Sequence, residues 1–243
     1  MYFVFDTETS GLPLSRFPKY HDLAAYDGCR IVSICWMVLD SNGTKVESEY
    51  HVIDPLSGGF TVPIEASRIH GISDEDARRD GVPFVSIVNK LAASLGRCKI
   101  MVAHNVSFDF GVLLSEMHRI HSFPVINQLF RIERVCTMKK GKEVLGLKRW
   151  PKLADMYKQL TGKDMVGAHN ARIDTECCAE CFLMLQKADA EAEAATASAS
   201  TSTTAEAESK IPMITTDEHI VEKIETVDAV TNIYNSLMSE FYR

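Results

Sequence analysis

The chain has 243 residues, with 26 basic and 33 acidic side chains and a net charge of −7. This length accommodates one or two domains. The charge is uneven: residues 1–186 carry 22 side chains of each sign, whereas residues 187–243 carry 4 basic and 11 acidic ones and hold the whole net charge. The neutral first region argues against tight nonspecific binding to duplex nucleic acid, where affinity comes from counterion release.

The seven cysteines lack the spacing of a disulfide scaffold, and the group at Cys177, Cys178 and Cys181 lacks the paired partners of a zinc site. We interpret them as small packing residues in a reducing, intracellular compartment, the cytoplasm or nucleus, and not in a secreted protein. Asp6 and Glu8 interrupt the apolar N-terminal run, which predicts neither a signal peptide nor a membrane span.

The first third of the chain reads as strands. A strand over 1–6 is followed by a loop over 9–29 and by strands over 30–39 and 44–53. The second strand is almost wholly apolar, which is typical of a strand covered on both faces. The dipeptide Asn42-Gly43 predicts a type I′ hairpin turn after it.

The remainder alternates helices with strands. The predicted elements are helices near 64–70 and over 84–96, strand 99–103, helix 107–121, strand 132–137, a basic loop, and helices 151–162 and 170–187. Strands first and β-α alternation later predict an α/β fold with a mixed sheet flanked by helices.

Two acids, Asp6 and Glu8, lie at the end of the first strand. Strand side chains alternate, so both point to one face, where their like charges repel. A divalent cation relieves that repulsion, and carboxylate ligands favour Mg²⁺ or Mn²⁺ over Zn²⁺. Taken alone, the pair is equally a strand end with two solvated acids before a glycine turn.

Two further acids begin helices. Asp109 falls in the first turn after a plausible cap at Ser107, where a carboxylate also favours the helix dipole. Asp174 begins an apolar helix, and His169 precedes it by five residues. Each of these residues has an ordinary structural explanation on its own.

Together the motifs resemble one family. Stretches VFDTETSGL, VAHNVSFDFGVL and AHNARIDTECCAECFLML occur in order, with a weaker IHGIS between the first two. Over residues 1–186 the chain resembles the DEDDh, or DnaQ-like, 3′–5′ exonucleases, which include bacterial proofreading subunits, ribonuclease T and oligoribonuclease. The resemblance implies a ribonuclease H-like fold with sheet order 3-2-1-4-5.

The resemblance also implies a site and a chemistry. Two Mg²⁺ (or Mn²⁺) ions would be held by Asp6, Glu8, Asp109 and Asp174, and His169 would be the general base that takes a proton from the attacking water. The implied reaction is hydrolysis at a single-stranded nucleic-acid 3′ end with release of nucleoside 5′-monophosphates. The implied substrate-binding residues are Thr7, Thr9, Leu12, His70 and Asn105, although Asn105 is better suited to bracing its loop.

The substrate is less defined. The His70-Gly71-Ile72-Ser73 stretch favours DNA, as in proofreading members. The alternatives are an exoribonuclease that processes RNA 3′ ends and a non-catalytic nucleic-acid-binding module on the same fold. A missing carboxylate would mark the binding module, and none is missing.

Two segments combine basic and aromatic residues. The loop from Pro13 to Gly28 carries Arg16, Lys19, Tyr20 and Tyr26, and either contacts a single strand or only covers a sheet edge. A second basic cluster surrounds Trp150-Pro151 and either engages phosphates upstream of the cleaved end or is solvated surface: Lys139, Lys140, Lys142, Lys148, Arg149 and Lys152.

The last part of the chain differs in composition. Residues 187–210 predict a low-complexity flexible linker, whose Ala-Glu start could prolong the preceding helix. Residues 211–243 predict an acidic tail, with apolar residues at helical spacing over 217–241. This amphipathic helix could bind a protein partner, self-associate, or pack on its own domain.

Overall fold

The computed structural model of the protein describes residues 1–16 and 18–200. Residues Met1–Ala194 form one compact unit, and of the second unit only the end of one helix is described. The predicted tail 211–243, with its helix over 217–241, lies outside the described residues. No described helix is both long and apolar enough to cross a membrane.

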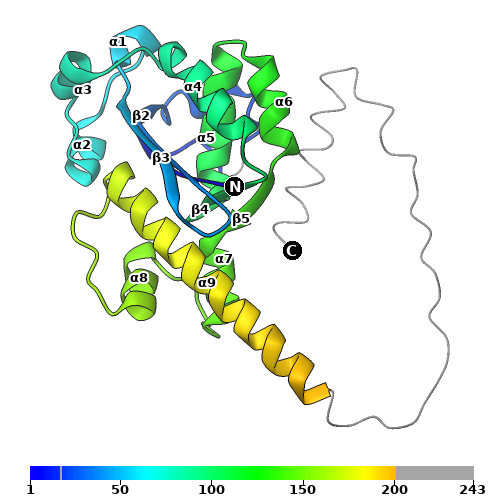
Figure 1. The fold of residues 1–243 in the computed structure, drawn as a ribbon. Coiled ribbons are helices and arrows are strands. Elements are labelled where there is room, and N and C mark those ends of the chain that lie inside the picture. The colour runs from blue at the N-terminus through cyan, green and yellow to red at the C-terminus, as the bar shows by residue number, and fades with distance from the viewer. Residues whose placement is uncertain (17, 201–243) are drawn as a thin grey trace. The chain divides into compact units, whose positions relative to one another are not determined.

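A five-stranded mixed sheet forms the centre of the first unit (Figure 1). Its order is β3-β2-β1-β4-β5; β1 pairs antiparallel with β2 and parallel with β4. This confirms the α/β fold and the predicted order 3-2-1-4-5. The strands are β1 (Tyr2–Thr9), β2 (Ile31–Leu39), β3 (Lys45–Val52), β4 (Ile100–Ala103) and β5 (Glu133–Cys136).

Helices fill the connections between and after the strands. They are the 3₁₀ helix η1 (Leu23–Tyr26) and the α-helices α1 (Pro55–Gly58), α2 (Ile64–His70), α3 (Asp74–Asp80), α4 (Phe84–Gly96), α5 (Val106–Arg119), α6 (Phe123–Arg131), α7 (Thr137–Val144), α8 (Leu153–Thr161) and α9 (Ala171–Ser200).

The two faces of the sheet have different partners. On one face, Val4 and Val102 pack against Cys178 and Phe182 of α9, and α8 packs on α9 in turn. On the other face, Phe3 and Trp36 stack with ring centroids 6.4 Å apart, and the Trp36 indole donates to the hydroxyl of Ser94 in α4 at 3.2 Å. Helices α4, α5 and α6 lie together in the fold (Figure 1). The cysteines of α9 are free thiols inside these packed clusters, as expected of packing residues.

The predicted secondary structure needs correction in several places. The turn after β2 is not type I′, because only Gly43 has a positive φ and the Asp40 carboxylate accepts from the amides of Asn42 and Thr44, which favours a turn closed by a left-handed glycine. Helices α1, α3 and α6 were not predicted. Part of the predicted basic loop is helix α7, whose Thr137 and Gly141 are buried.

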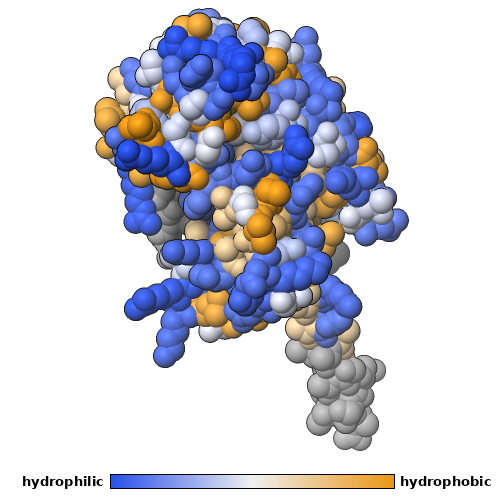
Figure 2. Space-filling view, turned by 90° about the vertical axis from the view of Figure 1, so that its left-hand side faces the viewer, coloured by the Kyte–Doolittle hydropathy of each residue, from blue (hydrophilic) through white to orange (hydrophobic). Residues whose placement is uncertain are grey.

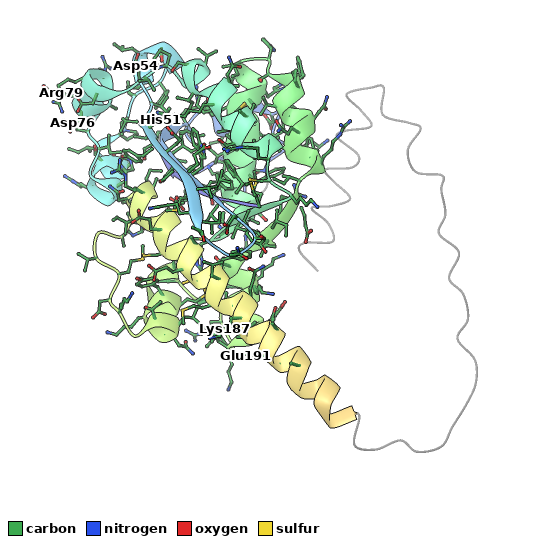
Figure 3. The ribbon with its side chains drawn as sticks, in the orientation of Figure 1. His51, Asp54, Asp76, Arg79, Lys187 and Glu191 are labelled. Atoms are coloured by element: carbon green, nitrogen blue, oxygen red, sulfur yellow. The ribbon has the colours of Figure 1, made fainter. Side chains whose placement is uncertain are left out.

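Helix α9 also runs past the predicted end at 187, through the Ala-Glu run, to Ser200. Lys187 and Glu191, one turn apart on its exposed side, form an ion pair at 3.8 Å (Figure 3). Lys140 of α7 pairs with Asp189 further along the same helix. The domain boundary at residue 186 stays a prediction.

The loop over 13–28 packs against α5 and α6: Arg119 of α5 donates to the carbonyl of Leu23 at 2.9 Å, and the rings of Tyr20 and Phe130 meet edge to face. Tyr20 and Tyr26 are each only 3% exposed, and the Tyr26 hydroxyl donates to the carbonyl of Pro18 at 3.3 Å. These two rings are therefore not available to stack on a single strand, and a strand contact by Arg16 or Lys19 stays a prediction.

A buried ion pair lies behind this loop. The Arg30 guanidinium donates to both carboxylate oxygens of Glu116 in α5, at 2.6 and 3.0 Å, and to the carbonyl of Gly58 at 2.9 Å. The backbone amide of Arg30 donates to the hydroxyl of Ser10, just after β1. The pair thus joins the end of β1, the start of β2 and helix α5.

Candidate active site

Strand β1 extends beyond its neighbour β4. The pairing between them covers only Tyr2 to Val4, whereas β1 continues to Thr9. Asp6 and Glu8 lie on this overhang, on the face of β1 that turns toward α9. The early end of β4 leaves room beside the overhang for residues from both helical layers.

Three of the four predicted carboxylates come together here. One oxygen from each of Asp6, Glu8 and Asp174 lies within 4.8 Å of the other two. Glu8 is 9% exposed, and the cluster consists of carboxylates alone. Such a donor set suits a hard divalent cation with oxygen ligands.

Helix α9 holds Asp174 through its first turn. The Asn170 side-chain oxygen accepts from the amides of Arg172 and Ile173, at 3.1 and 3.5 Å, which caps the helix. The Asp174 amide donates to the carbonyl of Asn170 at 2.9 Å. Among the described residues, Oδ1 of Asp174 is buried without a hydrogen-bond partner, so an acceptor stands ready for a cation.

The fourth carboxylate, Asp109, reaches the site from the opposite layer. Asp109 lies in the first turn of α5 and is 3% exposed. Its Oδ1 accepts from the backbone amide of Thr7 at 3.1 Å and from the Thr7 hydroxyl at 2.8 Å. Asp109 is not part of the three-residue cluster.

The electrostatics of the site reflect this crowding. Burial, followed by the charges of Asp109, Asp174 and Glu8, holds the pKa of Asp6 well above its usual range. Burial and the neighbouring carboxylates raise the pKa of Glu8 to about 7. Burial is also the main cause that raises the pKa of Asp109 to about 7 and that of Asp174 to about 6. Bare carboxylates in this arrangement repel one another, and a cation would remove that repulsion.

His169 lies on an exposed loop over 162–170, just before α9. It adopts a left-handed backbone conformation, with φ of 65°, and Gly167 of the same loop has φ of 83°. The charge of His169 and a hydrogen bond from its backbone both favour the ionised form of Asp174. The histidine is therefore beside the carboxylates on the solvent side.

The other four predicted substrate-binding residues have different environments. The Thr9 hydroxyl donates to the carbonyl of Gly11 at 2.8 Å, and Leu12 is 76% exposed. His70 is buried, and the pKa of its ring is lowered by burial and by nearby His169. Asn105 has φ of 68° and precedes α5. Their substrate contacts stay predictions.

Some exposed apolar side chains are close in sequence to the predicted site residues. Besides Leu12, the described residues include Leu14, Ile69 and Val166, each at least 60% exposed. Figure 2 shows that one face of the molecule carries hydrophobic patches separated by hydrophilic side chains.

Two structural roles were missed from the sequence. The side chain of Thr7 holds Asp109, which the alternation of β1, turning Thr7 away from Asp6, could have indicated. The predicted substrate contact of Thr7 stays a prediction. His104, next to Asn105, bridges Thr137 and the carbonyl of Pro151, each at 3.1 Å. No sequence pattern predicted that bridge.

Comparisons with known proteins agree with this arrangement. A family model for the RNase_T exonucleases matches residues 3–182. No curated protein matches the chain. Among solved structures, one of exonuclease I has a TM-score of 0.57 and 17% identity, covering 76% of this chain and 40% of that one.

Two further structures are complexes of E. coli exonuclease I. The one with a dT13 oligonucleotide has a TM-score of 0.56 and 17% identity, and the zinc-bound complex with single-stranded DNA has 0.55 and 17%; both cover 76% of this chain. The chain spans 40% of the length of these proteins, and at this identity the likeness shows a shared fold. The family match over most of the chain establishes more: this protein belongs to the RNase_T exonuclease family, the DnaQ-like 3′–5′ exonucleases.

Proposed function

We propose that this exonuclease hydrolyses phosphodiester bonds at single-stranded 3′ ends, with DNA as the favoured substrate, and releases nucleoside 5′-monophosphates. Two Mg²⁺ (or Mn²⁺) ions would be held by Asp6, Glu8, Asp109 and Asp174, and His169 would be the general base. The observation that carries the proposal is the convergence of Asp6, Glu8 and Asp174 within 4.8 Å at the end of β1.

The residues fit divalent cations. The donors are carboxylates, Oδ1 of Asp174 is a buried acceptor without a partner among the described residues, and the pKa values of the cluster are raised. Bound divalent ions would supply an activated water and stabilisation of the leaving oxyanion. Asp109, held by Thr7, is already oriented to add a fourth carboxylate from the other layer.

His169 would accept the proton of the attacking water. Its place beside Asp174 and its exposure to solvent both suit a base that must meet water and then release a proton. An imidazole is suited to this step because it titrates near neutral pH. The exposed loop, with left-handed residues at 167 and 169, positions the ring from outside the carboxylate cluster.

The preference for DNA is supported by the similar structures of E. coli exonuclease I, which are complexes with single-stranded DNA and with a dT13 oligonucleotide. Removal of RNA 3′ ends by the same residues is the principal alternative. Nothing in the described carboxylate cluster distinguishes the two sugars.

The test uses strands labelled at the 5′ end. Single-stranded DNA and RNA of one sequence, and 3′-recessed and mismatched duplexes, are incubated with the full chain in Mg²⁺, and products are resolved by length. We expect stepwise shortening from the 3′ end, fastest on single-stranded DNA, with 5′-monophosphates as products and no reaction in EDTA.

Faster degradation of RNA would reverse the substrate assignment. Tight binding of all strands without cleavage, by protein shown to be folded, would favour a non-catalytic binding module. Internal cleavage products would contradict the exonuclease assignment itself.

A further inference from the structure

Outside the carboxylate site, one surface combines an exposed indole with unpaired cations. Helix α7 and the loop after it hold six basic residues and one acidic residue, Glu143, over 137–152. Lys140 is already paired with Asp189. The Trp150 surface consists of Lys142, Lys148, Arg149, Trp150 and Lys152.

The Trp150 ring is open to solvent. Its side chain is 52% exposed, in contrast to Trp36, which is fully buried. The Lys142 ammonium lies 4.2 Å from the centroid of the Trp150 ring, a cation–π contact that orients the indole. An exposed, oriented indole offers a platform for stacking a planar group.

The charges of this surface are not neutralised within the described part of the chain. Lys148, Arg149 and Lys152 are exposed and have no acidic partner there. Because residues 1–186 are neutral as a whole, this concentration of positive charge is a local feature. Cations interleaved with an aromatic ring match the backbone and bases of a single strand.

The surface is also attached to the edge of the sheet that carries the candidate active site. His104 follows β4 directly, and its ring bridges the carbonyl of Pro151 and the hydroxyl of Thr137. Since a carbonyl can only accept, the Nε2 of His104 donates to Pro151. Burial lowers the pKa of His104, which favours a neutral ring with its proton on Nε2. Pro151, the neighbour of Trp150, is thereby bonded to His104. The next residue, Asn105, is the N-cap of helix α5, which carries Asp109.

We infer that the Trp150 surface binds the single strand on the 5′ side of the cleaved nucleotide, with a base stacked on Trp150 and phosphates contacted by Arg149 and its neighbours. This inference rests on the proposed function, since it names the path of the same substrate. The surface would lengthen the contact with long strands and leave chemistry on very short ones unchanged.

Fluorescence tests the contact directly. The chain has two tryptophans, and only Trp150 is exposed, so stacking of a base should quench its emission. A dT12 strand with phosphorothioate linkages at its 3′ end, which persists during the measurement, should quench emission, whereas dT2 should not. Trp150→Phe should abolish the signal and keep the affinity for dT12 within about threefold.

Binding measured by fluorescence polarisation of labelled strands gives the second readout. Trp150→Ala should weaken dT12 binding about tenfold. Arg149→Glu should also weaken it and should reduce the slope of log K against log salt by roughly 0.7, the value for one lost single-strand contact. Neither change should alter the affinity for dT2.

Arg131→Glu is the matched control. Arg131 is exposed and ends α6, two residues before β5 begins at Glu133. Glu133 pairs with Ile100, the first residue of β4, at the opposite end of the sheet from His104. The same charge reversal there should leave dT12 binding and its salt dependence unchanged.

Unchanged emission of Trp150 with saturating dT12, or unchanged dT12 affinity in Trp150→Ala, would overturn the inference. Emission that responds to deletion of residues 201–243 but not to dT12 would overturn it in favour of the acidic tail as occupant. Quenching by dT12 in a protein that cleaves no strand would support the surface and refute the proposed function. Normal cleavage with an unchanged KM for long strands in Trp150→Ala would support the proposed function and refute the Trp150 surface as a binding site.

Discussion

Asp109 and Asp174 occupy similar places in two helices but have different surroundings. Each lies in the first turn, and a non-glycine residue with positive φ precedes each helix: Asn105 before α5 and His169 before α9. Asp109 is deeply buried, and one of its oxygens accepts two hydrogen bonds from Thr7. Asp174 has a buried oxygen without a partner among the described residues, and an exposed loop precedes it.

The difference indicates a site with two unlike sides. On the prebuilt side, the carboxylate of Asp109 is held by hydrogen bonds within the protein, and on the open side, that of Asp174 has an oxygen without a partner among the described residues. The hydrogen bonds from Thr7 fix Asp109 within the sheet and the α4–α6 layer, so this side does not depend on a cation. The side formed by Asp174 and His169 has a buried acceptor without a partner among the described residues and an exposed histidine, which are the features that the proposed cation and base would use. Asp6 and Glu8 lie between the two sides.

The largest expected effect comes from Asp6, which lies between the two sides. Asp6→Ala should reduce turnover by at least ~10³-fold, because the central carboxylate of the proposed site is lost. The fold should persist, which circular dichroism can check. Glu75→Ala, which removes an exposed acid of α3, is the control and should be neutral. Near-normal cleavage by Asp6→Ala would refute the proposed metal site.

The open side is tested at His169. His169→Asn should lower turnover ~10²-fold with nearly unchanged substrate binding, because asparagine tolerates a positive φ but cannot act as a base at neutral pH. His121→Asn is the matched control, since His121 is an exposed histidine with φ of 54°. If His169→Asn weakened only substrate binding, His169 would be a positioning residue.

The prebuilt side is tested at Thr7. Thr7→Val keeps the shape and the backbone donor but removes the hydroxyl that donates to Asp109, and it should lower turnover by about tenfold. Thr175→Val is the control on the other side: its hydroxyl donates to the carbonyl of Ala171 at 2.6 Å. Both variants should lose about 1 kcal/mol of stability. Equal turnover in the two would mean that Thr7 serves only the fold.

The smallest effect concerns pH and stability without metal. Raised pKa values mean that the native state holds protons that the unfolded chain releases above about pH 4, so the acidic cluster lowers the free energy of unfolding as pH rises toward 7. In EDTA, Asp6→Asn should therefore melt a few degrees above the unmodified protein at pH 8, and the gap should shrink at pH 5.

Comparing the two proteins removes the opposite contribution of buried histidines such as His70, whose lowered pKa affects both equally. Added Mg²⁺ should raise the midpoint of the unmodified protein at pH 8 and not that of Asp6→Asn. A gap that does not change with pH would show that charge repulsion in the cluster is not a determinant of stability.

The sequence predicted secondary structure correctly wherever the local pattern of apolar residues agrees with how the element packs in the fold. Helices 64–70 and 84–96 were predicted at their observed bounds, and the sheet order followed from the family resemblance. Helix α6 was missed because its three buried residues, Val125, Ile126 and Leu129, form too short a pattern. Helix α9 runs past 187 to Ser200, in agreement with the expectation that the Ala-Glu run could prolong it, since alanine and glutamate favour helix even where no core is buried.

For the site, sequence motifs identified the carboxylates but not how they are held. Asp6, Glu8 and Asp174 were predicted together and are together. The bond from Thr7 to Asp109 and the bridge from His104 to Pro151 join residues that are 102 and 47 positions apart. Such contacts follow from tertiary packing, for which spacing along the chain carries no signal.

The buried pair of Arg30 and Glu116 has a consequence for how this sequence can vary. Loss of either partner would leave an uncompensated charge in the interior, whereas replacement of both by apolar residues of similar volume removes the two charges together. Positions 30 and 116 are therefore expected to change jointly or not at all during divergence. Because the pair ties the end of β1 to α5, that constraint reaches the two elements that carry Asp6 and Asp109.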